Sequence, residues 1–218
     1  MGGAILAVLP FAPGLLLSPL PPVAASMLAI ADDGRRRARL FILYWWCAVL
    51  LGCLAAGLAL RLSTPGVRLP DHADRLASLL LAVALVALAL VRGSGLVGCR
   101  CRSTWRSPAW LWRIGTLPTN RAGPFAVRVL YTDPLHLLVL TAAAVALAAT
   151  PGGLSAQLAA AALLALAGTL GVAFPLIVSY AAGWSGSVRL HALRSTPIRA
   201  YHGVGFWLSV GYAAFLLT

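Results

Sequence analysis

The sequence predicts an all-α polytopic membrane protein, in which six transmembrane helices form two inverted three-helix repeats and the first and fourth helices are broken at proline. Of the 218 residues, 61% are hydrophobic and only 10% are charged, which is far less charge than a soluble domain has. The polar residues gather between long apolar runs, as in membrane proteins. A proline motif in the first span recurs 115 residues later. By length this is one membrane domain, with repeat one at 1–92, a loop at 93–122 and repeat two at 123–218.

The charge balance indicates contact with lipid rather than with nucleic acid. The chain has 17 basic residues, all arginine, against five aspartates, and a formal net charge of +12. The arginines lie in loops beside apolar spans, where they set orientation and meet anionic headgroups. We therefore expect membrane lipids as partners and no nucleic acid. The four cysteines lack the spacing of a metal set, and we expect no metal and no cofactor.

Each predicted span has its own signal in the sequence. The first contains several prolines, and the second opens with Tyr44-Trp45-Trp46, which we expect near the headgroups after a charged turn at 32–39. The third is only 16 residues long and needs arginine side chains to reach outward at its ends. The fifth is rich in small residues that permit close helix packing. The predicted spans are 3–30, 40–60, 76–91, 124–149, 154–182 and 200–218.

Arginine counts predict the orientation in the cell (inner) membrane. Loops one, three and five are the arginine-rich ones, so they are expected in the cytoplasm, including the long loop 93–122, with both termini outside. Within that loop, tryptophans alternate with arginines, which suits a segment lying on the inner leaflet. An ordinary loop with interfacial anchors explains the pattern equally well. The membrane-surface candidates are Trp105, Arg106, Trp110, Trp112 and Arg113.

The two proline motifs, Ser18-Pro19-Leu20 and Asp133-Pro134-Leu135, predict helix restarts in the middle of spans one and four. Serine and aspartate are preferred N-caps, and proline is favoured at the first helical position. A restart frees backbone N–H groups at the positive end of a helix dipole. Two such ends that converge would form a polar pocket of the kind found in inverted-repeat transporters. The simpler alternative is a proline kink that the neighbouring side chain repairs.

Asp133 is the most unusual residue of this pattern. It is the only formally charged residue between positions 129 and 188, and an acid inside an apolar span marks a functional site by default. His136, three positions on, can share its helix face, so the two are candidates for a proton relay; a static hydrogen-bonded pair is the alternative. The candidate substrate-binding residues are Ser18, Pro19, Pro21, Asp133, Pro134 and His136.

The chain resembles the GAP family of small membrane proteins, within the LysE-type exporter superfamily. The resemblance rests on Leu17-Ser18-Pro19-Leu20-Pro21, the basic turn after it, the Trp-Arg-rich segment 110–121, and Val129-Leu130-Tyr131-Thr132-Asp133-Pro134. It implies a six-span protein that assists export of glycolipids or other solutes to the cell surface, beside a larger lipid transporter. The family usually has Asn-Pro-Lys at the second motif, where this chain has Asp133-Pro134-Leu135.

These features favour a transporter or export accessory for a lipid, glycolipid or amphipathic solute, acting alone or as a homo-oligomer, and not an enzyme. A LysE-type, proton-coupled exporter of amino acids or small cations is the alternative. A distant third is an intramembrane serine protease, because Gly183-Trp184-Ser185-Gly186 is followed by His202. Ser185 is expected at the cytoplasmic end of its span, away from membrane depth, which argues against the protease.

Overall fold

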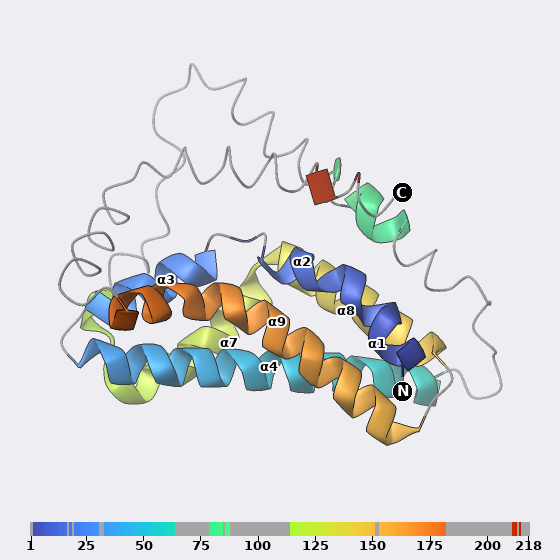
Figure 1. Cartoon of the computed structure of the whole chain (residues 1–218), viewed down its shortest axis with the longest axis horizontal. Helices are drawn as coiled ribbons and strands as arrows, with labels where there is room; N and C mark the ends of the chain where they lie inside the picture. The colour runs from blue at the N-terminus through green and yellow to red at the C-terminus, as the bar shows by residue number, and fades with distance from the viewer. Residues whose placement is uncertain are drawn as a thin grey trace, which may run out of the picture.

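The computed structural model shows a helical bundle (Figure 1), and it describes residues 2–16, 18, 20–30, 33–63, 79–84, 86–87, 114–150, 153–181, 211–212 and 214. No strand occurs among these residues. Two of their helices are long and apolar enough to cross a membrane, and there are up to four candidate spans if each of two bent helix pairs counts as one. The expected all-helical, membrane-type architecture is therefore present in this part of the chain.

The first predicted span is a series of short helices. Prolines at several positions remove backbone donors, so no single helix runs through this segment. After the break that contains Ser18, the direction of the chain changes by 61°. Pro19 itself lies outside the described residues. The helices are α1 (Gly2–Val8), the 3-10 helix η1 (Leu9–Phe11), α2 (Ala12–Leu16) and α3 (Leu20–Ile30).

Helix α4 (Gly34–Ser63) is longer than predicted, with 30 residues. The prediction of a charged turn over 32–39 is wrong for its arginines, which lie in the first turns of α4. Asp33 explains the early start: it has a φ of 56°, and its carbonyl accepts the backbone N–H groups of Arg36 and Arg37 at 3.1 and 3.2 Å. Gly34 is needed beside it, since a Cβ there would collide with the carbonyl oxygen of Ala29. The arginines that follow Gly34 continue the helix, because arginine is a good helix former.

The fourth predicted span is two helices, α7 (Ala122–Thr132) and α8 (Pro134–Ala149), which meet at an angle of 79°. Two 3-10 helices precede them, η2 (Ile114–Thr116) and η3 (Thr119–Arg121). The fifth span is α9 (Leu154–Ala181), within one residue of its predicted end. Predicted spans three and six are described only at 79–84 and 86–87 and at 211–212 and 214, so the six-span count is not settled by these residues.

Contacts at the two ends of the bundle fix the direction of each helix. At one end, which we call the arginine-rich end, Thr119 Oγ1 donates to Asp33 Oδ2 at 3.2 Å and the Arg35 guanidinium lies 4.9 Å from the centre of the Tyr180 ring. This end therefore contains the start of α4, the start of α7 and the last turn of α9.

At the opposite end, the last turn of α4 meets the end of α8. Arg61 there donates to the carbonyls of Leu147, Ala148 and Thr150 at 3.4, 3.4 and 2.9 Å. The long helices α4 and α9 consequently run antiparallel along the bundle (Figure 1). The broken span α1–α3 runs toward the arginine-rich end, and the broken span α7–α8 runs away from it.

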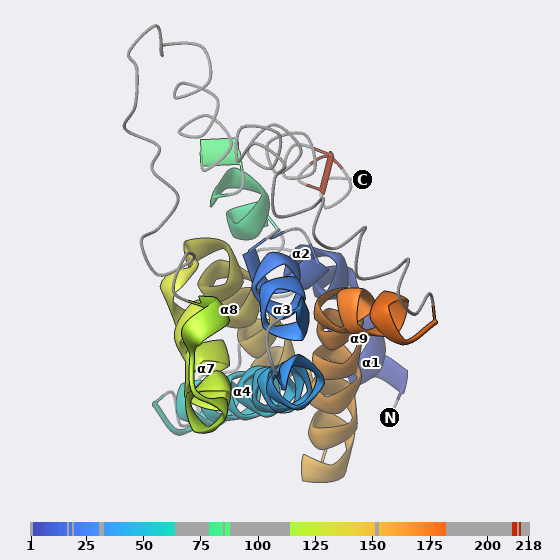
Figure 2. The same cartoon turned by 90° about the vertical axis from the view of Figure 1, so that its left-hand side faces the viewer.

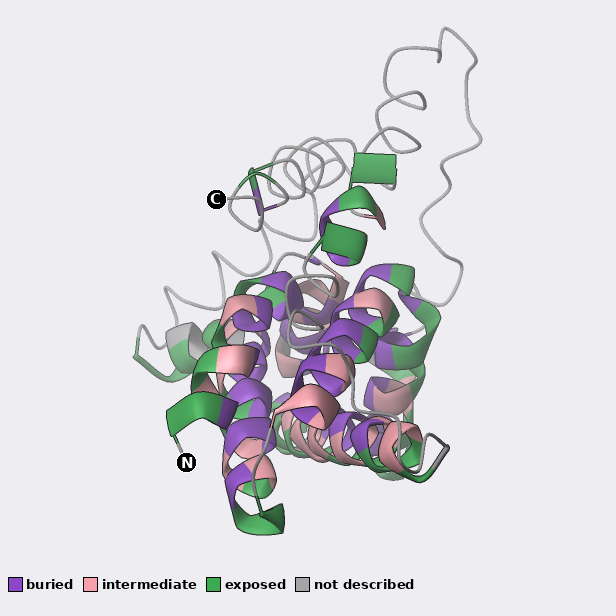
Figure 3. Cartoon of the chain, turned by 90° about the vertical axis from the view of Figure 1, so that its right-hand side faces the viewer, coloured by how far each residue is buried: buried purple, intermediate pink, exposed green. Residues whose placement is uncertain are grey.

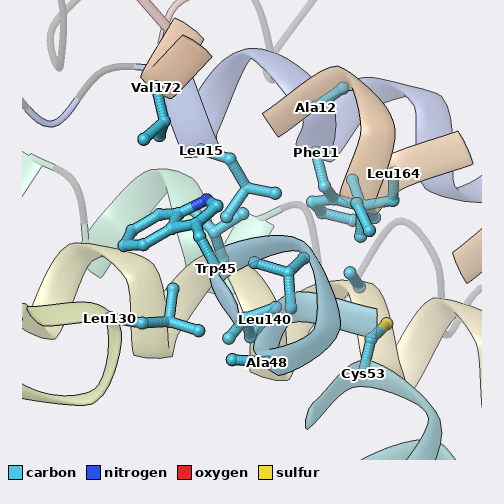
Figure 4. Packing of buried hydrophobic residues seen from close by; sticks show 14 of the residues in the cluster. Phe11, Ala12, Leu15, Trp45, Ala48, Cys53, Leu130, Leu140, Leu164 and Val172 are labelled. Carbon is cyan, nitrogen blue, oxygen red and sulfur yellow. The ribbon is translucent and has the colours of Figure 1, made fainter. Parts of the chain in front are cut away.

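Helix α4 is the centre of the packing. It contacts α3, α7, α8 and α9, and the end-on view shows α7 and α8 on one side of it and α9 on the other (Figure 2). Buried residues face one another inside this arrangement and exposed residues face outward (Figure 3). The core includes Trp45 together with Leu15 and Leu130 (Figure 4). Many large apolar side chains remain exposed, for example Leu51 at 63% and Phe174 at 64%, as expected for surfaces that meet lipid.

Candidate functional site

The break between α7 and α8 is organised by Asp133. Pro134 has no backbone N–H and occupies the first helical position of α8, where a missing donor costs nothing. Asp133 is extended, with φ −90° and ψ 112°, and its Oδ1 accepts the Leu135 N–H at 3.0 Å. This is a helix N-cap, and the carboxylate lies at the positive end of the α8 dipole.

Ser18, at the break of the first span, reaches the same carboxylate. Its Oγ donates to Asp133 Oδ2 at 2.5 Å, across 115 residues of sequence. That distance is at the short end of the range for a hydroxyl bound to a carboxylate oxygen. Ser18 is 1% exposed and Asp133 is 3% exposed. The two predicted restarts therefore meet, and one buried hydrogen bond joins them.

His136 completes the cluster from the first turn of α8. Its Nδ1 lies 3.2 Å from Asp133 Oδ2, close enough for an ion pair when the imidazole is protonated, although the approach does not make a hydrogen bond. The ring of Trp45 on α4 stands edge-on to the imidazole, with centroids 5.0 Å apart and an interplanar angle of 81°. Both side chains are fully buried. We call Ser18, Asp133 and His136 the Ser-Asp-His cluster.

Three polar atoms at this cluster have no hydrogen-bond partner among the described residues. They are the Nδ1 and Nε2 of His136 and the indole Nε1 of Trp45. An unsatisfied buried polar group costs about 1–3 kcal/mol, so most such groups in proteins are paired. Both oxygens of the Asp133 carboxylate therefore accept hydrogen bonds, whereas the nitrogens on the imidazole side of the cluster have no partner among the described residues.

The structure unites only part of the predicted substrate-binding set. Ser18, Asp133 and His136 lie together, and Pro21 is buried in the first turn of α3. Pro134 is exposed, so its ring points away from the cluster and its contribution is the helix break. Pro19 lies outside the described residues. So do the membrane-surface candidates Trp105, Arg106, Trp110, Trp112 and Arg113.

Among the described residues, the polar groups at the junction of the two breaks contact one another rather than open solvent. The Leu135 N–H is occupied by Asp133 itself, and the three side chains of the cluster are almost completely buried. An aspartate at the cap fills the position that a bound anion would take. No group of three or more histidine, cysteine or acidic residues occurs in the described part of the chain.

Trp45 was missed as a site residue. Its side chain is fully buried against His136, a contact that its expected place near the headgroups does not suggest. The cause is the early start of α4: eleven residues separate Gly34 from Trp45, which is about 17 Å of helix. The signal was present in the arginines, since a run of good helix formers directly before an apolar stretch favours one continuous helix.

The fold and the cluster define a class: a helical protein with two to four candidate membrane spans and a buried acid at a helix break. In comparisons with known proteins, no family model, no curated protein and no solved structure matches this chain.

Proposed function

We propose that this chain is a membrane transporter or export accessory that moves a lipid, glycolipid or other amphipathic solute toward the cell surface. It would act in the cell membrane, with both termini outside and the loop 93–122 in the cytoplasm. Its partners would be membrane lipids, a larger lipid transporter and, in a homo-oligomer, further copies of itself.

One observation supports this proposal most: the hydrogen bond from Ser18 to Asp133 joins the breaks of two antiparallel broken spans. Transporters with inverted repeats bind cargo where discontinuous helices meet near the bilayer midplane. The buried hydrogen bond between hydroxyl and carboxylate at that meeting point would have two states, formed and broken. It holds the halves together in a closed conformation and must break when a path opens.

The arrangement of the long helices agrees with an inverted repeat. Residues 34–63 of α4, shifted by 115, fall on 149–178, and α9 occupies 154–181. Each half would then begin with a broken span and continue with a long one, in opposite directions. The remaining span of each half would be 76–91 and 200–218, which completes the proposed six.

The family assignment is part of the proposal. Resemblance to the GAP family rests on the motifs around Ser18 and Asp133, without a matching family model to support it. That family's association with glycolipid export is the reason for placing a lipid or amphipathic solute first among the cargoes.

A second candidate is a LysE-type, proton-coupled exporter of amino acids or small cations. The observation that favours it is the buried pair of Asp133 and His136, 3.2 Å apart, because such pairs take up and release protons in transporters. The serine-protease alternative has no structural support, since Ser185 and His202 both lie outside the described residues. We propose no enzymatic activity.

A deletion strain complemented with variants tests the proposal. Asp133→Asn keeps an N-cap of the same shape but removes the charge, and Thr141→Val alters an exposed residue of the same helix as a control. We expect surface lipid extracts to lose a species in the deletion and in Asp133→Asn, and to regain it with the wild type and Thr141→Val. Normal surface lipids but reduced efflux of metabolites would select the second candidate. Normal export of both kinds by an inserted Asp133→Asn protein would refute the cluster as the working site.

A further inference from the structure

An open groove between α4 and α9 is separate from the Ser-Asp-His cluster. It has a volume of about 410 Å³ and contains Leu43 and Trp46 from α4 and Leu166 and Ile177 from α9. This volume lies within the range of small-molecule sites, about 300–1,000 Å³. Leu43, Leu166 and Ile177 are each about half exposed, so the wall of the groove is apolar and uncovered.

One end of this groove is positively charged. Arg39 lines it, together with Tyr180, and the Arg35 guanidinium lies over the Tyr180 ring at 4.9 Å. Among the residues that the structure describes, neither arginine has a carboxylate within ion-pair distance; the Arg39 Nε donates only to the carbonyl of Arg35 at 3.3 Å. The charged end of the groove therefore has two cations near an aromatic ring, and no carboxylate of the described part of the chain pairs with either of them.

An apolar trough with an uncompensated cationic end matches one class of ligand. We propose that the α4–α9 groove binds an anionic phospholipid of the membrane, with an acyl chain along Leu43, Trp46 and Leu166 and the phosphate at Arg39 and Arg35. A guanidinium group can donate two parallel hydrogen bonds to the oxygens of one phosphate. Each basic residue near an anionic membrane surface also strengthens the attraction to anionic lipid.

This lipid is a resident ligand and not the exported cargo. The groove contains no residue of the Ser-Asp-His cluster, and the inference does not depend on the proposed function. The phosphate would lie at the arginine-rich end of the bundle, where Thr119 binds Asp33 and the starts of α4 and α7 meet. A phosphate there would tie the start of α4 to the end of α9.

Quenching of tryptophan fluorescence by lipids with brominated acyl chains tests the proposal on the full chain in mixed vesicles. The probes are brominated phosphatidylglycerol and brominated phosphatidylcholine, and the Trp46→Phe variant isolates the contribution of the groove. We expect the Trp46-dependent signal to be quenched preferentially by the anionic lipid. Arg39→Gln should lower that preference about fivefold, the equivalent of about 1 kcal/mol.

Arg36→Gln is the matched control, because Arg36 is exposed on the same helix but does not line the groove. It should change the preference by less than about twofold, since only general surface charge is lost and salt screens it. Equal losses from both variants would overturn the proposal in favour of a diffuse surface potential. Equal quenching by both lipids would overturn it as well. So would the finding that the protein is a dimer and that Ala173→Phe converts it to a monomer without changing the quenching, because a second copy of the chain, and not a lipid, would then occupy the groove.

Discussion

The two helix breaks lie at matching positions of antiparallel spans, but they contribute different chemistry. The first, between α2 and α3, bends the chain by 61° and supplies the Ser18 hydroxyl; the second, between α7 and α8, bends it by 79° and supplies a carboxylate. The acid also caps its own helix and pairs with His136. Among the described residues, the first break thus donates one hydrogen bond, and the second accepts two and has a histidine within ion-pair distance. This difference indicates that the second break organises the cluster and the first one closes it.

The largest effect is expected from removing the acceptor. Asp133→Ala deletes the N-cap of α8 and leaves the Ser18 hydroxyl and the His136 imidazole buried without a carboxylate. The free energy of unfolding should fall by about 2–4 kcal/mol, the sum of a lost cap and an unsatisfied buried group. Chemical unfolding in mild detergent measures it. Thr141→Ala, on the exposed face of α8, should stay close to wild type.

A smaller effect is expected at the donor. Ser18→Ala removes one hydrogen bond, but Asp133 keeps the Leu135 N–H and the neighbouring imidazole. The loss should be about 1–2 kcal/mol, and in the double variant with Asp133→Ala it should shrink toward zero, because the two residues act through one contact. Strictly additive losses in the same unfolding experiment would mean that the hydrogen bond does not stabilise the protein.

The sequence was sufficient to predict that these breaks exist and that they meet. A serine or aspartate directly before a proline favours a helix restart, with a repaired proline kink as the alternative, and the 115-residue offset predicts which restarts are partners. The local chemistry at Asp133 was also predictable, since a cap and an i, i+3 histidine are features of neighbouring residues.

What the sequence did not predict depends on packing between distant segments. Trp45 reads as an interfacial aromatic, and only the true start of α4 at Gly34 places it beside His136. The closed state of the cluster was unpredictable for a similar reason. Whether a capping carboxylate leaves room for a ligand depends on how closely α2 and α8 approach, and helix periodicity contains no information about that distance.

The two broken spans also differ in how they pack against one glycine of each long helix, Gly168 of α9 and Gly52 of α4. A Cβ at Gly168 of α9 would lie 2.7 Å from Leu15 Cδ1 and 3.0 Å from its Cβ, whereas a Cβ at Gly52 of α4 would meet the Tyr131 hydroxyl at 2.6 Å and nothing else closer than 3.7 Å. Leu15 is 1% exposed and has no room to move; Tyr131 is 43% exposed and can turn outward.

Alanine at each glycine tests this contrast. Gly168→Ala should destabilise the protein by about 1–3 kcal/mol through overpacking of the first broken span. Gly52→Ala should cost less than about 1 kcal/mol, because the Tyr131 ring swings away and alanine is the better helix former. Thermal unfolding of the two variants in the same detergent gives the comparison. A larger loss at Gly52 would show that the second span, and not the first, is the tightly fitted one.

The smallest effect is expected at Trp45, the residue that contacts the cluster from outside both breaks. Trp45→Phe removes buried volume, which destabilises a core. It also removes an indole N–H that has no partner among the described residues, which relieves a cost of about 1–3 kcal/mol. The two terms oppose each other, so stability should change by less than about 1 kcal/mol, and Trp46→Phe, half-buried on the same helix, controls for loss of an indole. A loss above about 3 kcal/mol would mean that the Trp45 N–H has an acceptor in the native protein, so that this side of the cluster is better paired than the described residues show.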